Sequence, residues 1–140
     1  MRVPLVVFRD ITIRALRNLG HSSEDAELIT TVLEYAELRG NNQGIIKLVA
    51  GALAPDPAQR DIKIVYETPV SARLDGGQRI GMVVVSRAVE IAIQKAKTTG
   101  ISIVGVSGYA SATGALGMWV RQLTDAGLVG VVLSQCSEMV

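Results

Sequence analysis

Residues 101–117 read ISIVGVSGYASATGALG, a nearly unbroken apolar run followed by a loop of small residues that leads into a helix. Strands of a parallel sheet are covered on both faces and lack polar alternation, so the run Ile101–Val106 predicts such a strand. Periodicity predicts a crossover helix over Ala115–Thr124, and the apolar run Leu128–Leu133 predicts a second covered strand. Covered strands that alternate with helices predict an α/β fold.

The residues before this stretch divide into a helical part and a mixed part. Helical spacing of apolar residues predicts helices over Phe8–Leu19 and Ser22–Arg39, each followed by a glycine that can end it. The remaining predicted elements are a helix at 45–53, short strands at 62–66 and 72–74, a turn at 75–77 and a helix at 82–97. We therefore expect an N-terminal helical segment over residues 1–54 and a partial α/β domain over residues 55–140.

The predicted sheet lacks neighbours for its strands. A sheet needs three or more strands to be independently stable, and the sequence supplies few candidates before it ends shortly after Leu133. Charged residues make up only 19% of the chain and the mean hydropathy is +0.35, so there is more apolar surface than one small domain easily encloses. We expect an N-terminal helical hairpin followed by an incomplete mixed sheet with crossover helices, truncated at the C-terminus.

Composition excludes several functional classes. The chain has 14 Lys and Arg against 13 Asp and Glu, a net charge of +1, and 49% hydrophobic residues, which excludes a disordered tail or a basic nucleic-acid arm. No apolar run reaches the ~18 residues of a membrane-spanning helix, and the opening run Val3–Phe8 is too short for a signal peptide. Cys136 has no second cysteine to pair with, and no cluster of metal ligands is present. We expect a cytoplasmic protein that binds no nucleic acid, membrane or metal.

Residues 39–47, RGNNQGIIK, join two predicted helices and carry side-chain amides between two glycines. We call this segment the elbow. Free backbone N–H groups at the start of the helix at Ile45 could hold a carboxylate or phosphate, with Arg39 or Lys47 adding positive charge. The alternative is a plain Asn-rich connection without a ligand, and spacing alone favours that connection.

Residues 107–117, SGYASATGALG, follow a predicted strand and open a predicted helix, and we call this segment the small-residue loop. Small residues let backbone N–H groups approach an anion there, and the helix dipole favours negative charge. The glycine spacing is neither Gly-x-Gly-x-x-Gly nor that of a Walker loop, and Gly114 and Gly117 could equally let the helix lie tightly on the sheet. His21, the only histidine, lies before a helix start, where a solvated or capping role is expected.

Several segments together resemble the type-2 malate/L-lactate dehydrogenase family, whose members are NAD(P)-dependent and lack a Rossmann domain. They are LG at 19–20, SEDA at 23–26, ELRG at 37–40, QGIIKL at 43–48, ETP at 67–69, LDG at 74–76, AVEIAIQKAKTTG at 88–100, TGALG at 113–117 and AGLVG at 126–130. The resemblance spans nearly the whole chain in order. Family members are more than twice as long, which agrees with the incomplete predicted sheet.

The resemblance implies a homodimer with its active site near the subunit boundary. It also implies hydride transfer between NAD or NADP and a small 2-hydroxy/2-oxo acid or a cyclic imine. Gln43 stands where the family motif Arg-Gly-x-x-Ser-His-Gly has a histidine in the substrate site, and a glutamine amide cannot donate a titratable proton near neutral pH. The resemblance therefore implies that either this chain has different chemistry or the acid/base group lies outside it.

By this resemblance the substrate-binding residues are Arg39, Asn42, Gln43 and Lys47, with Gln43 in the catalytic position, and the cofactor-binding residues are Ser111, Thr113 and Gly114. Many family members have Asn-His-Phe before the glycine that corresponds to Gly114, whereas this chain has Ser-Ala-Thr at 111–113. We expect an N-terminal portion of an NAD(P)-dependent oxidoreductase. The alternatives are an inactive truncated remnant and an unrelated α/β nucleotide-binding module.

Overall fold

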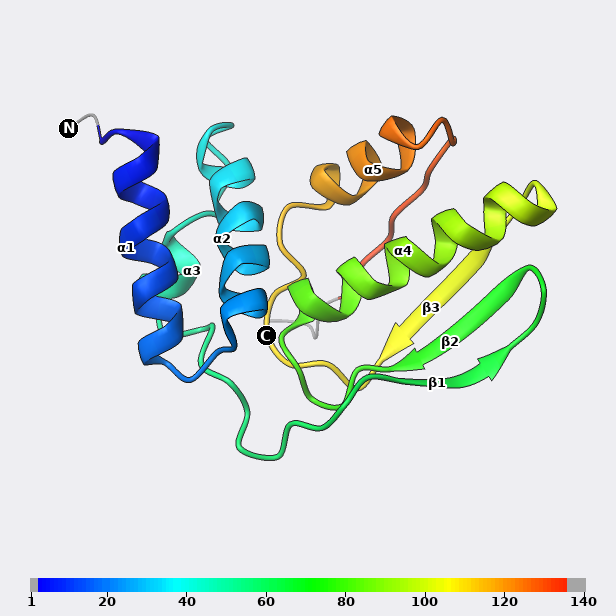
Figure 1. Ribbon diagram of the computed structural model, residues 1–140, viewed down its shortest axis with the longest axis horizontal. Coiled ribbons are helices and arrows are strands. Elements are labelled where there is room, and N and C mark those ends of the chain that lie inside the picture. Colours follow the sequence, from blue (N-terminus) through cyan, green and yellow to red (C-terminus); the bar gives the residue numbers. More distant parts are fainter. Residues whose placement is uncertain (1–2, 136–140) are drawn as a thin grey trace.

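The computed structural model describes residues 3–135, and within that range it contains five helices and three strands (Figure 1). In chain order the elements are α1 (Leu5–Asn18), α2 (Ser23–Glu37), α3 (Ile46–Val49), β1 (Lys63–Glu67), β2 (Ser71–Asp75), α4 (Gly81–Thr99), β3 (Ile103–Ser107) and α5 (Leu116–Asp125). The first three helices lie at one end of the molecule, and the sheet, α4 and α5 make up the other (Figure 1). None of the helices in this range is both long and apolar enough to span a membrane.

Helices α1 and α2 form the expected helical hairpin. Gly20 takes a φ of +103° just after α1, a conformation that glycine adopts without strain. At the start of α2, the Ser22 Oγ accepts a hydrogen bond from the Asp25 N–H at 3.0 Å and so caps the helix. Leu16 of α1 and Leu33 of α2 are fully buried in one hydrophobic cluster. The two sequence-predicted helices are thus confirmed, with ends that differ by one to three residues.

Arg9 on α1 joins two carboxylates of α2. Its Nη2 lies 3.0 Å from Glu27 Oε2 and its Nη1 lies 2.8 Å from Glu34 Oε2. The hydrogen bond that Arg9 donates to the Glu34 carboxylate raises the pKa of Arg9 above its ordinary value, although partial burial acts in the opposite direction. The guanidinium therefore stays positively charged and links α1 to α2 through the two carboxylates.

The sheet is mixed, with the strand order β1-β2-β3. β1 and β2 are antiparallel and pair from Lys63 opposite Asp75, with an irregularity between Ile64 and Tyr66. β2 and β3 are parallel and pair from Ser71 opposite Ile103, with α4 as the crossover between them. Helix α4 lies across one face of the sheet (Figure 1), where β2 and α4 bury residues that include Ala72, Leu74, Ala88 and Ile91. The expected mixed sheet and crossover helix are confirmed.

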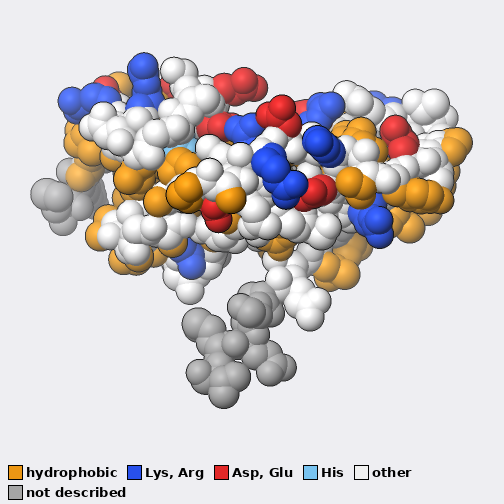
Figure 2. Space-filling model, turned by 90° about the horizontal axis from the view of Figure 1, so that it is seen from below, with side chains coloured by type: hydrophobic (Ala, Val, Ile, Leu, Met, Phe, Trp, Pro, Cys, Tyr) orange, Lys and Arg blue, Asp and Glu red, His pale blue; other side chains and the backbone are white. Residues whose placement is uncertain are grey.

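One buried cluster joins the helical hairpin to the α/β part. Trp119 of α5 and Met82 of α4 are fully buried in the same cluster as Leu16, Ile29 and Leu33 of the hairpin. Hydrophobic side chains nevertheless remain exposed on the face seen in Figure 2, where they gather over the hairpin at one end and over the end of the sheet at the other. Charged side chains lie between these two groups (Figure 2).

The third helix is shorter than predicted. α3 covers only Ile46–Val49, whereas periodicity predicts a helix over Ile45–Leu53. Gly51 takes a φ of +73°, the left-handed conformation that commonly follows the end of a helix. The chain turns there, and Leu53 is fully buried as a result. The apolar residues after Val49 therefore mark a return into the core and not a further helical turn.

Two predictions about covered strands are wrong. β3 alternates between exposed and half-buried residues, because α4 covers only one face of the sheet. The predicted strand Leu128–Leu133 pairs with no strand among residues 3–135, and Val129 and Leu133 are 100% and 88% exposed. β1, which forms near the short strand predicted at 62–66, is exposed at all five positions. An apolar run can predict the extended conformation, but a strand also needs a neighbouring segment that the run itself does not contain.

Candidate functional site

The elbow between α2 and α3 is held by its own side chains. Asn41 Oδ1 accepts the Gln43 N–H at 2.9 Å, and the Gln43 Nε2 donates to Asn42 Oδ1 at 3.2 Å. At its start, the Arg39 guanidinium lies over the Tyr35 ring, 3.6 Å from the ring centroid, and donates a hydrogen bond to the Tyr35 carbonyl at 3.0 Å. The Gln43 amide is thus held by the residues before it, and Arg39 is fixed by a cation–π contact.

Glu37 occupies the position where a bound anion was expected. Its Oε2 accepts the Ile45 N–H at 3.1 Å, at the start of α3. A Cβ on Gly44 would overlap the same Glu37 oxygen, so the close approach of this carboxylate requires glycine at position 44. The Ile45 N–H therefore binds the chain's own carboxylate, as in the connection without a ligand that the spacing favours. The side chains of the elbow remain available to hold a substrate.

Lys47 lies half-buried in the single turn of α3, two residues after the N–H that Glu37 binds. The ion pairs found within residues 3–135 do not include it. Arg39 is exposed at the other end of the elbow. The elbow therefore carries two cations that flank Gln43 in the chain, an arrangement suited to a small carboxylate.

The small-residue loop connects β3 to α5. Ser111 takes a φ of +61° and its Oγ donates to the Ala52 carbonyl, just after α3. The Trp119 Nε1 donates to the Thr113 carbonyl at 2.8 Å, and the Thr113 Oγ1 lies 3.5 Å from the Ser134 Oγ. α5 then begins without a side-chain cap, so the N–H groups of its first turn receive no side-chain acceptor.

Gly114 is explained by packing. It takes a φ of +77°, and a Cβ at this position would overlap the Val32 side chain of α2 and lie 3.5 Å from Met82 Cγ. At Gly117, a Cβ would lie 3.2 Å from the Tyr35 hydroxyl. Both glycines therefore bring the start of α5 close to the helices, whereas the alternative raised from the sequence was close packing on the sheet.

Tyr35 brings the two predicted segments together. Its ring carries the Arg39 guanidinium and its hydroxyl lies beside Gly117 at the start of α5. A second link is the hydrogen bond from Ser111 to the Ala52 carbonyl. Arg39 and the small-residue loop thus lie on the same side of α2, although they are far apart in the sequence. This juxtaposition depends on tertiary packing, and no local pattern predicts it.

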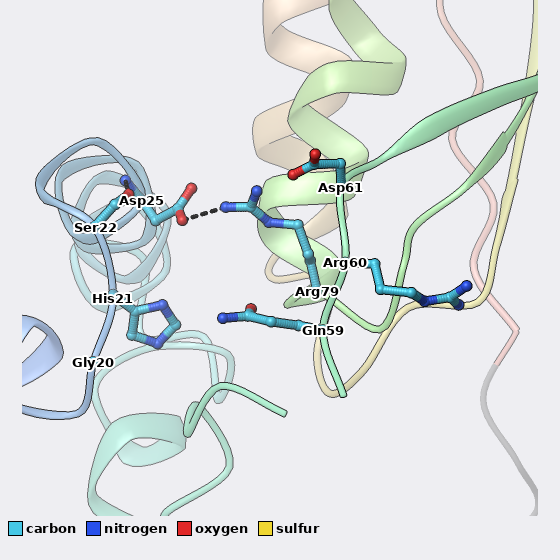
Figure 3. Close-up of a pocket in the computed structure, with 8 residues that line it drawn as sticks. All are labelled: Gly20, His21, Ser22, Asp25, Gln59, Arg60, Asp61 and Arg79. Atoms are coloured by element: carbon cyan, nitrogen blue, oxygen red, sulfur yellow. Dashed lines mark hydrogen bonds and ion pairs between the residues drawn. The ribbon is translucent and has the colours of Figure 1, made fainter. Parts of the chain in front are cut away.

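A polar pocket of about 340 Å³ lies where the start of α2 faces the segment before β1 (Figure 3). Its lining residues are Gly20, His21, Ser22, Asp25, Gln59, Arg60, Asp61 and Arg79. Asp25 and Arg79 meet across it, with their oxygen and nitrogen 2.5 Å apart, and the His21 ring faces the Gln59 side chain (Figure 3).

Two of the charged groups of this pocket, Asp25 and Arg79, bind each other. Asp25 and Arg79 keep only 14% and 28% of their side-chain surface exposed, and the ion pair ties the hairpin to the segment just before α4. His21 Nε2 lies 2.7 Å from the Leu53 carbonyl oxygen, a contact across 32 positions of sequence that no local pattern could have indicated. We assign the pocket a structural role at the junction between hairpin and sheet. Within residues 3–135, no group of three His, Cys, Asp or Glu side chains is arranged to hold a metal ion.

Comparison with known proteins gives one consistent family. The family model described as malate/L-lactate dehydrogenase matches residues 3–140. The malate dehydrogenase of Pyrococcus abyssi is 31% identical over the whole chain, and the match covers 40% of that protein. The L-sulfolactate dehydrogenase of Methanocaldococcus jannaschii is 35% identical over 74% of this chain and 34% of that protein.

Solved structures agree with the sequence relatives. The structure of malate dehydrogenase from Pyrococcus horikoshii superimposes with a TM-score of 0.80 at 31% identity, over 91% of this chain and 38% of that one. The sulfolactate dehydrogenase from Methanocaldococcus jannaschii gives a TM-score of 0.78 at 31% identity, over 89% of this chain and 38% of that one. This chain thus spans 40% of the length of the first curated relatives, and its match lies in their N-terminal part.

Proposed function

The chain belongs to the malate/L-lactate dehydrogenase family, and we propose that it is the N-terminal portion of an NAD(P)-dependent oxidoreductase acting on a small 2-hydroxy/2-oxo acid. The resemblance stated from the sequence is thereby confirmed at the level of the family, and the unrelated nucleotide-binding module is no longer an alternative. The relatives are named as malate dehydrogenase and L-sulfolactate dehydrogenase, and malate and sulfolactate are both 2-hydroxy acids. We further propose a cytoplasmic homodimer for the complete protein.

The arrangement of side chains in the elbow is the main support for this proposal. Glu37 binds the Ile45 N–H at the start of α3, so a substrate carboxylate would bind the Lys47 and Arg39 side chains. The Gln43 amide, with Asn42 beside it, would orient the carbonyl or hydroxyl of the substrate by hydrogen bonds. It cannot act as general acid at neutral pH, and in this proposal its role is orientation while the proton is exchanged elsewhere.

The small-residue loop fits one part of a nicotinamide dinucleotide. Thr113 supplies a hydroxyl and the uncapped start of α5 supplies N–H donors, a set that suits phosphate oxygens, while Ser111 holds the loop in place through its bond to the Ala52 carbonyl. Gly114 would contribute through its close packing on Val32, which sets the position of this helix start, and not through direct contact. The cofactor, when bound, supplies or accepts the hydride. Which of NAD and NADP binds depends on groups beyond this loop.

A completed protein is needed to test the proposal. We define the chimera as residues 1–140 of this chain followed by the part of Pyrococcus horikoshii malate dehydrogenase that lies beyond its match. In the chimera, Lys47→Met should raise the KM for the acid substrate by about tenfold or more, since a hydrogen bond to a charged group contributes ~1.5–3 kcal/mol. Lys97→Met, at an exposed position late in α4, is the matched control and should leave KM unchanged. Equal KM values for both variants would contradict the assignment of Lys47.

A further inference from the structure

A hollow of about 650 Å³ lies between β3 and the end of the described chain. Its lining consists of residues 104–106 of β3, Tyr109 and residues 133–135. The sheet order β1-β2-β3 leaves β3 with a single partner strand, β2, among residues 3–135. β3 is parallel to β2, and its other edge therefore opens into this hollow.

The backbone of β3 shows which groups face the hollow. The Ile103 N–H donates to the Val70 carbonyl at 2.9 Å, and the Ser107 carbonyl accepts the Gly76 N–H at 2.7 Å, so both residues direct their backbone groups toward β2. Backbone groups alternate between the two edges of a strand, so those of Val104 and Val106 point to the open edge. Val104 and Val106 both line the hollow, together with Gly105 between them.

The segment on the far side of the hollow has the exposure pattern of an unpaired strand. Val129, Val131 and Leu133 are 100%, 80% and 88% exposed, whereas the residues between them are half-buried. Such a period of two is the pattern of a strand with one face against protein. Ile103 on β3 is likewise 70% exposed, on the face that α4 does not cover. Both β3 and residues 129–133 thus carry exposed apolar side chains, and the unpaired edge of β3 lies between them.

We propose that this hollow receives one extended strand from the polypeptide that forms the C-terminal remainder of malate/L-lactate dehydrogenases. The strand would pair with the Val104 and Val106 backbone groups and extend the sheet beyond β3. The relatives supply the argument for this occupant, because this chain spans only 40% of their length. Parallel strands are normally covered on both faces, which further chain of this kind would achieve. The inference rests on family membership and on the open edge, and it holds whether or not Lys47 and Gln43 bind substrate.

The test follows the amide hydrogens of the isotope-labelled 140-residue chain by hydrogen exchange and NMR. The probe is a set of short overlapping peptides that cover the part of Pyrococcus horikoshii malate dehydrogenase beyond its match with this chain. Strand addition depends mainly on main-chain hydrogen bonds, so a peptide of related sequence suffices. One peptide should slow the exchange of the Val104 and Val106 amides by about tenfold or more. The Ile103 amide, already bonded to Val70, should not change.

Two variants sharpen the result. Val104→Pro removes the N–H that faces the hollow but none that faces β2, and it should abolish the effect of the peptide on Val106. Val104→Thr keeps the N–H and should retain that effect. If Val104→Pro does not fold, the amide exchange of the free chain is compared with that of the chimera. In the chimera the Val104 and Val106 amides should exchange more slowly than in the free chain. The proposal is overturned when no peptide protects the two amides, or when they exchange equally fast in the folded chimera. If the two amides become protected from exchange as the concentration of the chain is raised without peptide, the edge of β3 pairs with a second copy of the chain, and the proposal is overturned.

Discussion

Gly114 offers a quantitative test of how the small-residue loop is positioned. An alanine at this position would adopt a left-handed φ of +77° and would also overlap Val32. The backbone conformation costs ~1–2 kcal/mol for a residue with a Cβ, and forcing an extra carbon into a packed site costs ~1–3 kcal/mol. We therefore expect Gly114→Ala to lower the free energy of unfolding by about 2–5 kcal/mol.

Gly127 is the matched control for this prediction. Its φ is +79° and no atom lies within 4 Å of a Cβ placed there, so Gly127→Ala should cost only the backbone part, ~1–2 kcal/mol. Combining Gly114→Ala with Val32→Ala should recover about 1–3 kcal/mol of the overlap, so that the two changes are not additive.

The assay is urea denaturation followed by the fluorescence of Trp119. This residue is the only tryptophan, is 0% exposed, and donates a hydrogen bond to Thr113 in the loop itself. Circular dichroism supplies a second, independent probe. A Gly114→Ala variant no less stable than Gly127→Ala, or strict additivity with Val32→Ala, would refute the packing of the loop on α2.

Three further predictions concern the elbow and the open sheet. Glu37→Ala should lower the free energy of unfolding by about 1 kcal/mol, because the Ile45 N–H loses its acceptor, and Glu37→Gln should keep most of that stability; equal losses in urea denaturation would show that the bond contributes nothing. In the chimera, Gln43→Ala should lower kcat/KM by about tenfold, because the substrate loses a hydrogen-bond partner worth ~0.5–1.5 kcal/mol, and an unchanged kcat/KM would remove position 43 from the site. The isolated chain should self-associate at micromolar concentration through exposed apolar side chains such as Val129 and Leu133, without protecting the Val104 and Val106 amides, and a single sharp monomer boundary in analytical ultracentrifugation would contradict this expectation.

The sequence allows the fold to be predicted where signals are local. The Ser22 cap, the glycine after α1 and the spacing of apolar residues each indicate a helix boundary or a buried face within a few residues of chain. Prediction fails where a partner is needed. Leu128–Leu133 has the composition of a covered strand but no neighbouring strand among residues 3–135, and α3 ends early because the chain turns at Gly51.

The candidate site divides in the same way. The amides and cations of the elbow can be read from the sequence, and so can the small residues before α5. The sequence did not indicate that Glu37 would occupy the backbone donor at Ile45, because that contact spans eight positions and depends on the path of the elbow. The position of Tyr35 between Arg39 and Gly117 is also set by the packing of α5 on α2. The roles of the individual site residues remain predictions that the variants above test.

The central claim is that residues 1–140 supply the N-terminal portion of a dehydrogenase and need the rest of the family fold for activity. The most direct measurement compares the isolated chain with the chimera for oxidation of NADH and NADPH by oxaloacetate, pyruvate and sulfopyruvate, followed by absorbance. We predict no turnover by the isolated chain and turnover of at least one 2-oxo acid by the chimera. Robust turnover by the isolated chain, or a folded chimera that oxidises neither nucleotide with any of the three acids, would contradict the account.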